Sequence, residues 1–345
     1  MAQLIQFVKP TLRRKDMQAV LQTMVDEKIG PGERKKEFLS EISLRLGMKS
    51  GIALRSYFQA LLNGLVSLGV TQGSKILTSV LAPSIYGIAA EKLGAHLILC
   101  DINKENGCIS TESALDAIHK DGGDFLLLHE PYAQIPYGED YSNVGLPILE
   151  DITESIGSSF EDLQAGSIGD LVICAFEEDH VLSCGGGAVL LYRNDRYKSI
   201  INSVFRGIAP FEELPDMNAA LGIVQLANFD AFLKRRREIS RLFRTSLLKT
   251  DHKQFGNGSL DFETNGWNFP VILDSKYEDV IKFAKKYNVS CQKMFVDSLG
   301  YPLKSRYPSF PQALPTLLRS VAFPLYPFLK GSEVDTMVKV ISHLP

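Results

Sequence analysis

A chain of 345 residues is long enough for one large domain and a smaller one, each with its own hydrophobic core. Hydrophobic residues make up 45% of the chain and charged residues 22%, which is ordinary for a globular protein. The formal net charge of −3 gives no electrostatic reason to expect binding to nucleic acid or to an anionic membrane surface.

Short apolar runs alternate with amphipathic segments through the first two thirds of the chain. Apolar periodicity predicts helices over residues 35–46, 58–68, 85–93 and 111–119. Runs of a few consecutive apolar residues predict buried strands over residues 76–80, 96–100, 125–128, 148–149, 171–176 and 188–192. This alternation indicates an α/β fold with a mostly parallel sheet that helices cover on both faces.

The last third of the chain has a different pattern. Residues 216–248 keep helical spacing throughout and are predicted as one long helix, with Lys234 to Arg237 on a solvated face. Beyond it we expect strands at 267–273 and 321–323, helices at 277–287 and 333–343, and an irregular loop over 301–315, which holds four prolines. The predicted organisation is an N-terminal segment (1–34), a large α/β domain (35–230) and a small C-terminal α+β domain (231–345).

The five cysteines are scattered, and they form neither a CxxC pair nor a pattern with histidines at metal-ligand spacing. We therefore expect no metal site and no disulfide framework, as in a reducing cytoplasm. The sequence also lacks an N-terminal signal-peptide pattern and any apolar run of the roughly 20 residues that a membrane span requires. The expected location is cytoplasmic, away from membranes.

Several strings along the chain resemble one protein family. They are Gly30-Pro31-Gly32 before Phe38, the strand-helix-strand unit from Ile76 to Asp101, the helix 216–226 (DMNAALGIVQL) and Leu325-Tyr326-Pro327. In combination they are similar to the DegT-like sugar-nucleotide aminotransferases, fold-type-I enzymes that use pyridoxal phosphate (PLP). The resemblance implies that fold, a homodimer and a sugar-nucleotide ligand. The chain departs from the family between His129 and Pro147, where a helix is nearly deleted.

The strand-end acid of the family corresponds to Asp151, where the resemblance implies contact with the pyridine nitrogen of PLP. The lysine that binds the cofactor covalently in the family has become His180, and a histidine cannot make that bond. The serine before it has become Ala175. Asp151 can also cap the next turn or pair with a local donor, which is the more ordinary use of such an acid. His180 can likewise be an exposed loop residue.

The remaining cofactor-binding positions that the resemblance assigns are mostly substituted as well. The Ser-Gly-Thr phosphate cup at a helix N-terminus is Ser56-Tyr57-Phe58 here, which replaces a glycine and a hydroxyl by two bulky rings. The aromatic residue that stacks on the cofactor ring is Pro83, with Tyr86 as a substitute only if the helix starts differently. Glu154 would place a carboxylate beside the cofactor's phenolate oxygen, an unfavourable contact.

Two further segments belong to this comparison. The family's Asn-x-Arg segment, which a partner subunit contributes, aligns near Phe211-Glu212-Glu213 and would exchange a cation for acids. The glycine-rich turn is Gly185-Gly186-Gly187, and we expect it to keep its backbone path. His129 falls where the family also has a histidine, and we interpret it as structural.

The loss of so many positions favours a homologue with a degenerate PLP site, which is non-catalytic or regulatory, close to sugar-nucleotide or polysaccharide metabolism, and without a cofactor. The alternative is a keto-deoxysugar dehydratase or aminotransferase that holds PLP or its amine form PMP non-covalently, with His180 as acid and base. Histidine suits this role because its unperturbed pKa is about 6.5. A third hypothesis is a cofactor-independent enzyme in which Asp179-His180 acts with Glu154 and Glu177.

Overall fold

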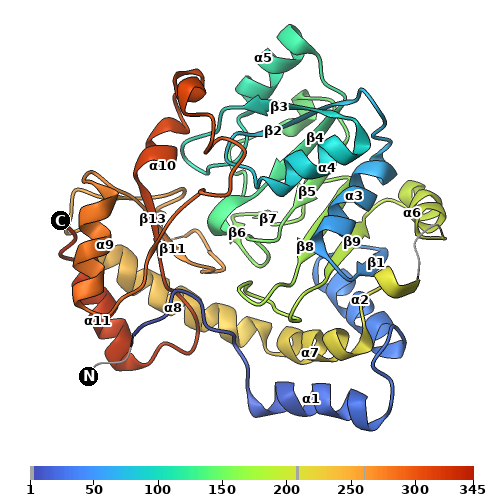
Figure 1. Ribbon diagram of the computed structural model, residues 1–345, viewed down its shortest axis with the longest axis horizontal. Coiled ribbons are helices and arrows are strands. Elements are labelled where there is room, and N and C mark those ends of the chain that lie inside the picture. Colours follow the sequence, from blue (N-terminus) through green and yellow to red (C-terminus); the bar gives the residue numbers. More distant parts are fainter. Residues whose placement is uncertain (1–3, 207–209, 260) are drawn as a thin grey trace.

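The computed structural model describes residues 4–206, 210–259 and 261–345. Seven strands form its central sheet, in the spatial order β1-β9-β8-β5-β4-β2-β3 (Figure 1). Strands β8, β5, β4, β2 and β3 run parallel, whereas β9 and β1 extend the sheet by antiparallel pairing. The strands are β1 (Ser50–Leu54), β2 (Lys75–Ser79), β3 (His96–Cys100), β4 (Phe125–His129), β5 (Ile148–Asp151), β8 (Leu171–Ala175) and β9 (Ala188–Tyr192). The predicted α/β fold with a mostly parallel sheet is confirmed.

Helices cover both faces of this sheet because successive strand residues point to opposite sides. One core contains Ile173 and Leu190 with Leu61 of α3, and the other contains Cys174 and Val189 with Phe38 of α2. Both sets of side chains are fully buried, so the strands appear in the sequence as continuous apolar runs. The helices of this part are α2 (Glu33–Arg45), α3 (Tyr57–Leu68), α4 (Ile85–Leu93), α5 (Thr111–Asp121), α6 (Arg196–Arg206) and α7 (Asp216–Ala227).

A second, antiparallel sheet lies at the other end of the molecule, in the order β10-β11-β13-β12 (Figure 1). Phe243, Phe269, Val280 and Met337 share its core with the helices that cover it. Its elements are α8 (Phe229–Leu247), β10 (Lys253–Gln254), β11 (Phe269–Ile272), α9 (Tyr277–Lys286), β12 (Gln292–Lys293), α10 (Leu314–Arg319), β13 (Ser320–Phe323) and α11 (Gly331–Ile341). The domain boundaries at residues 34 and 230 stay predictions.

The long helix predicted over residues 216–248 is wrong in one respect, because it consists of two helices that meet at Asn228. Helix α7 ends at Ala227 and α8 begins at Phe229. The Asn228 side chain donates to the Val224 carbonyl over 2.7 Å. An asparagine amide competes in this way with the backbone hydrogen bonds of a helix, and periodicity alone does not reveal the break.

The solvated face predicted for Lys234 to Arg237 is wrong for Arg236, whereas Lys234 is exposed. Arg236 is only 3% exposed, and its guanidinium donates to the carbonyl oxygens of Gly266 and Leu325, each over 2.8 Å. Burial lowers the pKa of Arg236 to about 9. Its side chain therefore joins α8 to the loop before β11 and to the segment after β13.

Other segments without a predicted element are ordered as well. Helix α1 (Arg14–Val25) packs beside α7, and a small hairpin is formed by β6 (Ser159–Phe160) and β7 (Leu163–Gln164). Between β4 and β5 the chain makes only two short 3-10 turns, at Pro131–Ala133 and Tyr141–Asn143. The predicted deletion of a helix between His129 and Pro147 is therefore confirmed. Within the described ranges, no helix has both the length and the apolarity needed to cross a bilayer.

Candidate functional site

A cleft of about 400 Å³ opens where the carboxyl ends of β4 and β5 face the turn after β8 and the segment 292–298. Register brings the last residues of the two strands together, because His129 pairs with Asp151. In open α/β sheets, ligands bind beyond the carboxyl ends of the strands, and this volume falls within the range of small-molecule sites. The lining includes Tyr57, Pro83, Ile85, His129, Tyr132, Asp151, Thr153, Glu154, Glu177, Asp179, His180, Trp267, Lys293, Phe295, Asp297 and Ser298.

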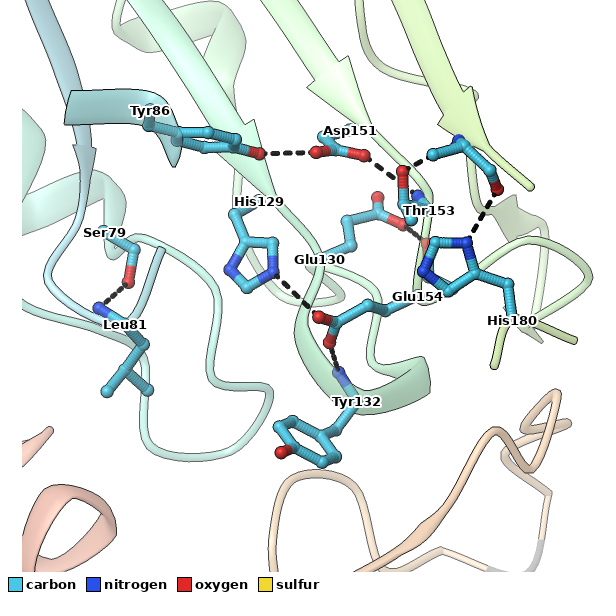
Figure 2. A network of polar contacts seen from close by, with 12 residues as sticks. Ser79, Leu81, Tyr86, His129, Glu130, Tyr132, Asp151, Thr153, Glu154 and His180 are labelled. Atoms are coloured by element: carbon cyan, nitrogen blue, oxygen red, sulfur yellow. Dashed lines mark hydrogen bonds and ion pairs between the residues drawn. The ribbon is translucent and has the colours of Figure 1, made fainter. Parts of the chain in front are cut away.

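Asp151 lies at the floor of this cleft and is almost completely buried. Its Oδ2 atom accepts hydrogen bonds from the hydroxyls of Tyr57 and Tyr86. Figure 2 shows the contact with Tyr86, over 2.7 Å. Its Oδ1 atom accepts from the backbone N–H of Thr153 over 3.0 Å. Both carboxylate oxygens are therefore engaged by groups of the chain itself.

The two tyrosines that contact Asp151 come from different helices. Tyr57 begins α3 and Tyr86 lies in the first turn of α4, so the carboxylate joins both helices to the end of β5. Burial, followed by the nearby carboxylate, raises the pKa of both phenols well above the ordinary value of 10.0. Each hydroxyl thus stays protonated and acts as a donor.

The N-terminus of α3 is capped from within the chain. The Ser56 hydroxyl accepts from the backbone N–H of Gln59 over 3.3 Å. The Phe58 side chain packs on the core that contains Leu61 of α3, whereas Tyr57 lines the cleft. The Ser56 cap and the Tyr57 ring occupy the place where the resemblance puts a phosphate cup.

Pro83 lines the cleft as expected for the stacking position, but Tyr86 does not take that position. Tyr86 is fully buried in the core that contains Ile173 and Leu190. Its ring is roughly perpendicular to that of His129, with the two ring centroids 6.1 Å apart. Helix α4 begins at Ile85, as predicted, so its first turn directs the Tyr86 hydroxyl to Asp151. The possible role of Tyr86 as a substitute stacker is therefore excluded by its burial.

Glu154 follows β5 and lines the cleft beside His129. Its Oε2 atom accepts from the backbone N–H of Tyr132 over 2.7 Å, and its Oε1 atom lies 3.8 Å from His129 Nε2 (Figure 2). Tyr132 adopts a left-handed backbone conformation, with φ of 47°. A tyrosine rarely takes this conformation, and the contact with Glu154 helps to hold it there.

His180 lies in the turn between β8 and β9, and its side chain is only 11% exposed. The interpretation of His180 as an exposed loop residue is therefore wrong. Its Nδ1 atom lies 3.1 Å from the Glu177 backbone nitrogen and 3.0 Å from the Ala175 carbonyl oxygen, so the backbone holds it in either tautomer. Its Nε2 atom lies 3.7 Å from Asp179 Oδ1. Ala175 is buried at the end of β8, and its N–H donates to Thr153 Oγ1 over 3.0 Å.

The segment Phe211-Glu212-Glu213 packs against the end of β1 in its own chain. The Glu212 carbonyl accepts from the Arg55 N–H over 2.8 Å, and Glu213 forms an ion pair with Lys35.

The glycine turn 185–187 keeps positive φ at all three residues, and a side chain on Gly187 would clash with Leu214 at 2.3 Å.

The structure brings together five of the predicted site residues, since Tyr57, Pro83, Asp151, Glu154 and His180 all line the cleft. The other three, Ser56, Phe58 and Ala175, do not belong to its lining as far as the structure describes it. Within the same described ranges, no group of three or more His, Cys, Asp or Glu side chains is placed to hold a metal ion.

Sequence reasoning missed the aromatic wall of the cleft. Tyr132 packs on Trp267 and Phe295 with ring centroids 5.2 and 5.0 Å away. The Trp267 indole N–H donates to the Asp179 carbonyl over 2.7 Å, which fixes the ring beside His180. The single tryptophan of the chain was a visible signal, but its distance in sequence from the strand ends concealed its place.

Comparisons with known proteins agree with this architecture. The model of the DegT/DnrJ/EryC1/StrS aminotransferase family matches residues 10–342. The spore coat polysaccharide biosynthesis protein SpsC of Bacillus subtilis is 22% identical, with 96% of this chain and 95% of that protein aligned.

Two solved structures share the fold. The aminotransferase TlmJ of Streptoalloteichus hindustanus superposes with a TM-score of 0.86 and 20% identity, over 98% of each chain. The GDP-4-keto-6-deoxy-D-mannose-3-dehydratase of E. coli, solved with bound hydrated PLP, gives a TM-score of 0.85 and 16% identity. That match covers 99% of this chain and 100% of the dehydratase.

Proposed function

The chain belongs to the DegT/DnrJ/EryC1/StrS aminotransferase family, and from this premise we propose that it is a non-catalytic or regulatory member with a degenerate PLP site. Its role would lie close to sugar-nucleotide or polysaccharide metabolism, where its relative SpsC also belongs by name. The proposal concerns the cleft, because a shared fold alone does not carry an activity.

One observation carries the proposal, namely the closed network around Asp151. The resemblance assigns this carboxylate to the pyridine nitrogen of PLP. Here its Oδ2 atom already accepts two tyrosine hydroxyls, and its Oδ1 atom accepts a backbone N–H. A cofactor ring would have to displace Tyr57 and leave buried phenols without their acceptor, at a cost of about 1–3 kcal/mol for each donor.

The phosphate and carbonyl ends of PLP fit no better. At the start of α3 the Ser56 hydroxyl takes the cap position, and the Tyr57 ring fills the adjacent space. The lysine in the lining is Lys293, whose ammonium lies over the rings of Tyr301 and Tyr277, 5.2 and 5.9 Å from their centroids. A phosphate dianion would meet carboxylates in this cleft. The residues present therefore do not fit PLP.

Titration with PLP and with PMP, followed by dialysis, tests the proposal. We expect neither compound to change absorbance or fluorescence saturably or to remain after dialysis. Free pyridoxal, which lacks the phosphate, serves as the control for non-specific reaction with surface lysines. Saturable, dialysis-resistant retention of PLP or PMP, beyond that of pyridoxal, would contradict the proposal.

Restoring the lysine alone is expected to fail. His180→Lys supplies the missing amine, but the network on Asp151 and the ring of Tyr57 remain. We expect this variant to retain no more PLP after borohydride reduction and dialysis than His180→Gln, a matched variant without an amine. Stoichiometric retention by the lysine variant alone would show that the pocket still accepts the cofactor.

The position of His180 favours one alternative, a keto-deoxysugar dehydratase or aminotransferase. The imidazole lines the cleft, its Nδ1 atom is held by the backbone, and its Nε2 atom is directed away from that contact. Imidazole is a common general acid and base in enzymes. Saturable binding of PMP in the titration would favour this alternative over the first proposal.

We also propose that the protein forms a homodimer, as the resemblance implies. An apolar face on α1 supports this, because Met17, Leu21 and Met24 are 60%, 57% and 55% exposed. These side chains line one shallow apolar depression together with Leu12, Val20 and Leu221. Exposed apolar patches of this kind often mark protein interfaces.

A charge on this face should weaken the dimer. Leu21→Glu is expected to shift the protein from dimer to monomer in sedimentation velocity, because a carboxylate would be buried without a partner. Gln18→Glu places the same charge on the exposed side of α1, outside the depression, and should leave the dimer intact. A wild-type monomer, or equal behaviour of both variants, would contradict this interface.

A further inference from the structure

The lining of the cleft carries an excess of negative charge. Its carboxylates are Asp151, Glu154, Glu177, Asp179 and Asp297, and its cationic side chain is Lys293. The ammonium of Lys293 faces two tyrosine rings and forms no ion pair with a described residue. The field inside the cleft therefore favours a positively charged occupant and disfavours a phosphate.

A buried histidine in the same wall lacks partners. His129 is 3% exposed, and neither of its ring nitrogens has a hydrogen-bond partner among the described residues. Its Nε2 atom faces Glu154 Oε1 across 3.8 Å, which is too long for a hydrogen bond (Figure 2). Both ring nitrogens are closed off from the cleft, so His129 lies behind the Glu154 carboxylate. Glu154 lines the cleft, and its Oε1 atom accepts no hydrogen bond from a described residue.

The same cleft also has an apolar surface. Tyr132, Trp267 and Phe295 pack edge to face or tilted against one another around the cleft. Tyr132 and Phe295 both adopt left-handed backbone conformations, with φ of 47° and 57°. Aromatic faces attract cations as well as apolar groups, so this wall complements the carboxylates.

We infer that the cleft binds a small organic cation, with its ammonium group on the Glu154 carboxylate and its apolar body against Tyr132 and Trp267. The ammonium donates to Glu154 Oε1, the oxygen that the Tyr132 N–H does not occupy. This inference rests on the proposed function, because it requires a cleft that PLP does not fill.

Trp267 makes the cleft directly observable, since it is the single tryptophan of the chain. We would titrate the full-length protein with phenethylamine, 2-phenylethanol and phenylacetate, which share one ring and side-chain length but are cationic, neutral and anionic. We expect the amine to change Trp267 fluorescence saturably and to bind at least about tenfold more tightly than the alcohol, as one desolvated ion pair allows. Phenylacetate should bind more weakly than the alcohol.

Glu154→Gln tests the carboxylate itself. Its amide oxygen can still accept from the Tyr132 N–H, so the loop keeps its contact while the charge is removed. We expect amine affinity to fall about tenfold and the affinity for the alcohol to stay unchanged. Glu112→Gln, an equal change of charge on exposed α5, should leave both affinities unchanged.

Three results would overturn the inference: no binding of the amine, equal binding of the amine and the alcohol, or tighter binding of phenylacetate. A PLP titration under the same conditions distinguishes the two proposals. Saturable PLP binding contradicts the proposed function, whereas absence of both PLP and amine binding contradicts only the cation site.

Discussion

Replacement of Asp151 by alanine is expected to lower the free energy of unfolding by about 3–5 kcal/mol in the absence of any ligand. The substitution removes the shared acceptor of two buried phenols and of the Thr153 N–H. Each orphaned donor contributes about 1–3 kcal/mol. The substitution also removes the hydrogen bonds that link α3 and α4 to the end of β5. Urea unfolding followed by circular dichroism measures the change.

Two single substitutions calibrate this prediction. Tyr57→Phe and Tyr86→Phe each remove one donor and leave the carboxylate with its other partners, so each should cost about 0.5–3 kcal/mol. A carboxylate kept in reserve for a cofactor would behave differently, because removing an unpaired buried anion relieves a desolvation penalty. A loss of less than about 1 kcal/mol in Asp151→Ala would therefore argue that Asp151 is available to a ligand.

Most of the central sheet could be predicted because its strands are buried on both faces. Strands such as β8 and β9 appear as uninterrupted apolar runs, and the glycines at 69 and 94 end α3 and α4 in left-handed conformations. Strand β1 was missed because Ser50 and Gly51 interrupt its apolar pattern. Gly51 is required there, since a side chain would lie 2.1 Å from the Leu190 carbonyl oxygen.

The error on Arg236 in α8 has a tertiary cause. Arg236 carries a charge that predicts exposure, yet two carbonyl oxygens from distant segments accept its hydrogen bonds and permit burial. His180 was misjudged for the same reason. A turn residue is ordinarily exposed, but Trp267 arrives from the second sheet region and covers it.

For the site, the resemblance identified positions but not their new partners. It indicated that Tyr57 adds bulk where a phosphate cup would lie. It did not indicate that the same ring reaches Asp151, 94 residues further along the chain, or that Tyr86 meets it from 65 residues away. Contacts of such separation depend on the crossing of helices over the sheet, and local patterns carry no information about them.

A buried pair of acids next to the cleft was also invisible in the sequence. Glu130 and Glu150 are fully buried and lie close together, and the Glu130 Oε1 atom has no partner in the hydrogen bonds of the described residues. Glu150 accepts from the backbone N–H groups of Gly166, Ile168 and Gly169 at 2.5–2.9 Å, which favours the negative charge on Glu150 over Glu130. Burial, followed by the charge of Glu150, raises the pKa of Glu130 well above its ordinary value of 4.5 and keeps it protonated.

Because the two carboxyls have different partners, we expect Glu→Gln substitutions at positions 130 and 150 to have opposite effects on stability. Glu150→Gln places an amide with one acceptor oxygen against three N–H donors, and should destabilise the protein by about 2–4 kcal/mol. The amide of Glu130→Gln can still donate a hydrogen bond to Glu150, and it has no carboxyl proton to lose. At pH 8 this substitution should therefore leave the free energy of unfolding unchanged or raise it. Chemical unfolding of the two variants measures both effects, and a large loss in Glu130→Gln with none in Glu150→Gln would reverse the assignment of the proton.

The pH dependence of stability follows from the raised pKa of Glu130. In the unfolded chain this carboxyl loses its proton near pH 4.5, whereas in the folded protein it keeps the proton to a higher pH. The folded state then binds more protons, so the contribution of Glu130 is complete below pH 4.5 and declines as pH rises through its folded pKa. Because Glu130→Gln has no such proton to lose, its stability relative to wild type should increase steadily from pH 5 to pH 8. A constant difference over this interval would mean that Glu130 is ionised in the folded protein, beside Glu150 and without a compensating cation.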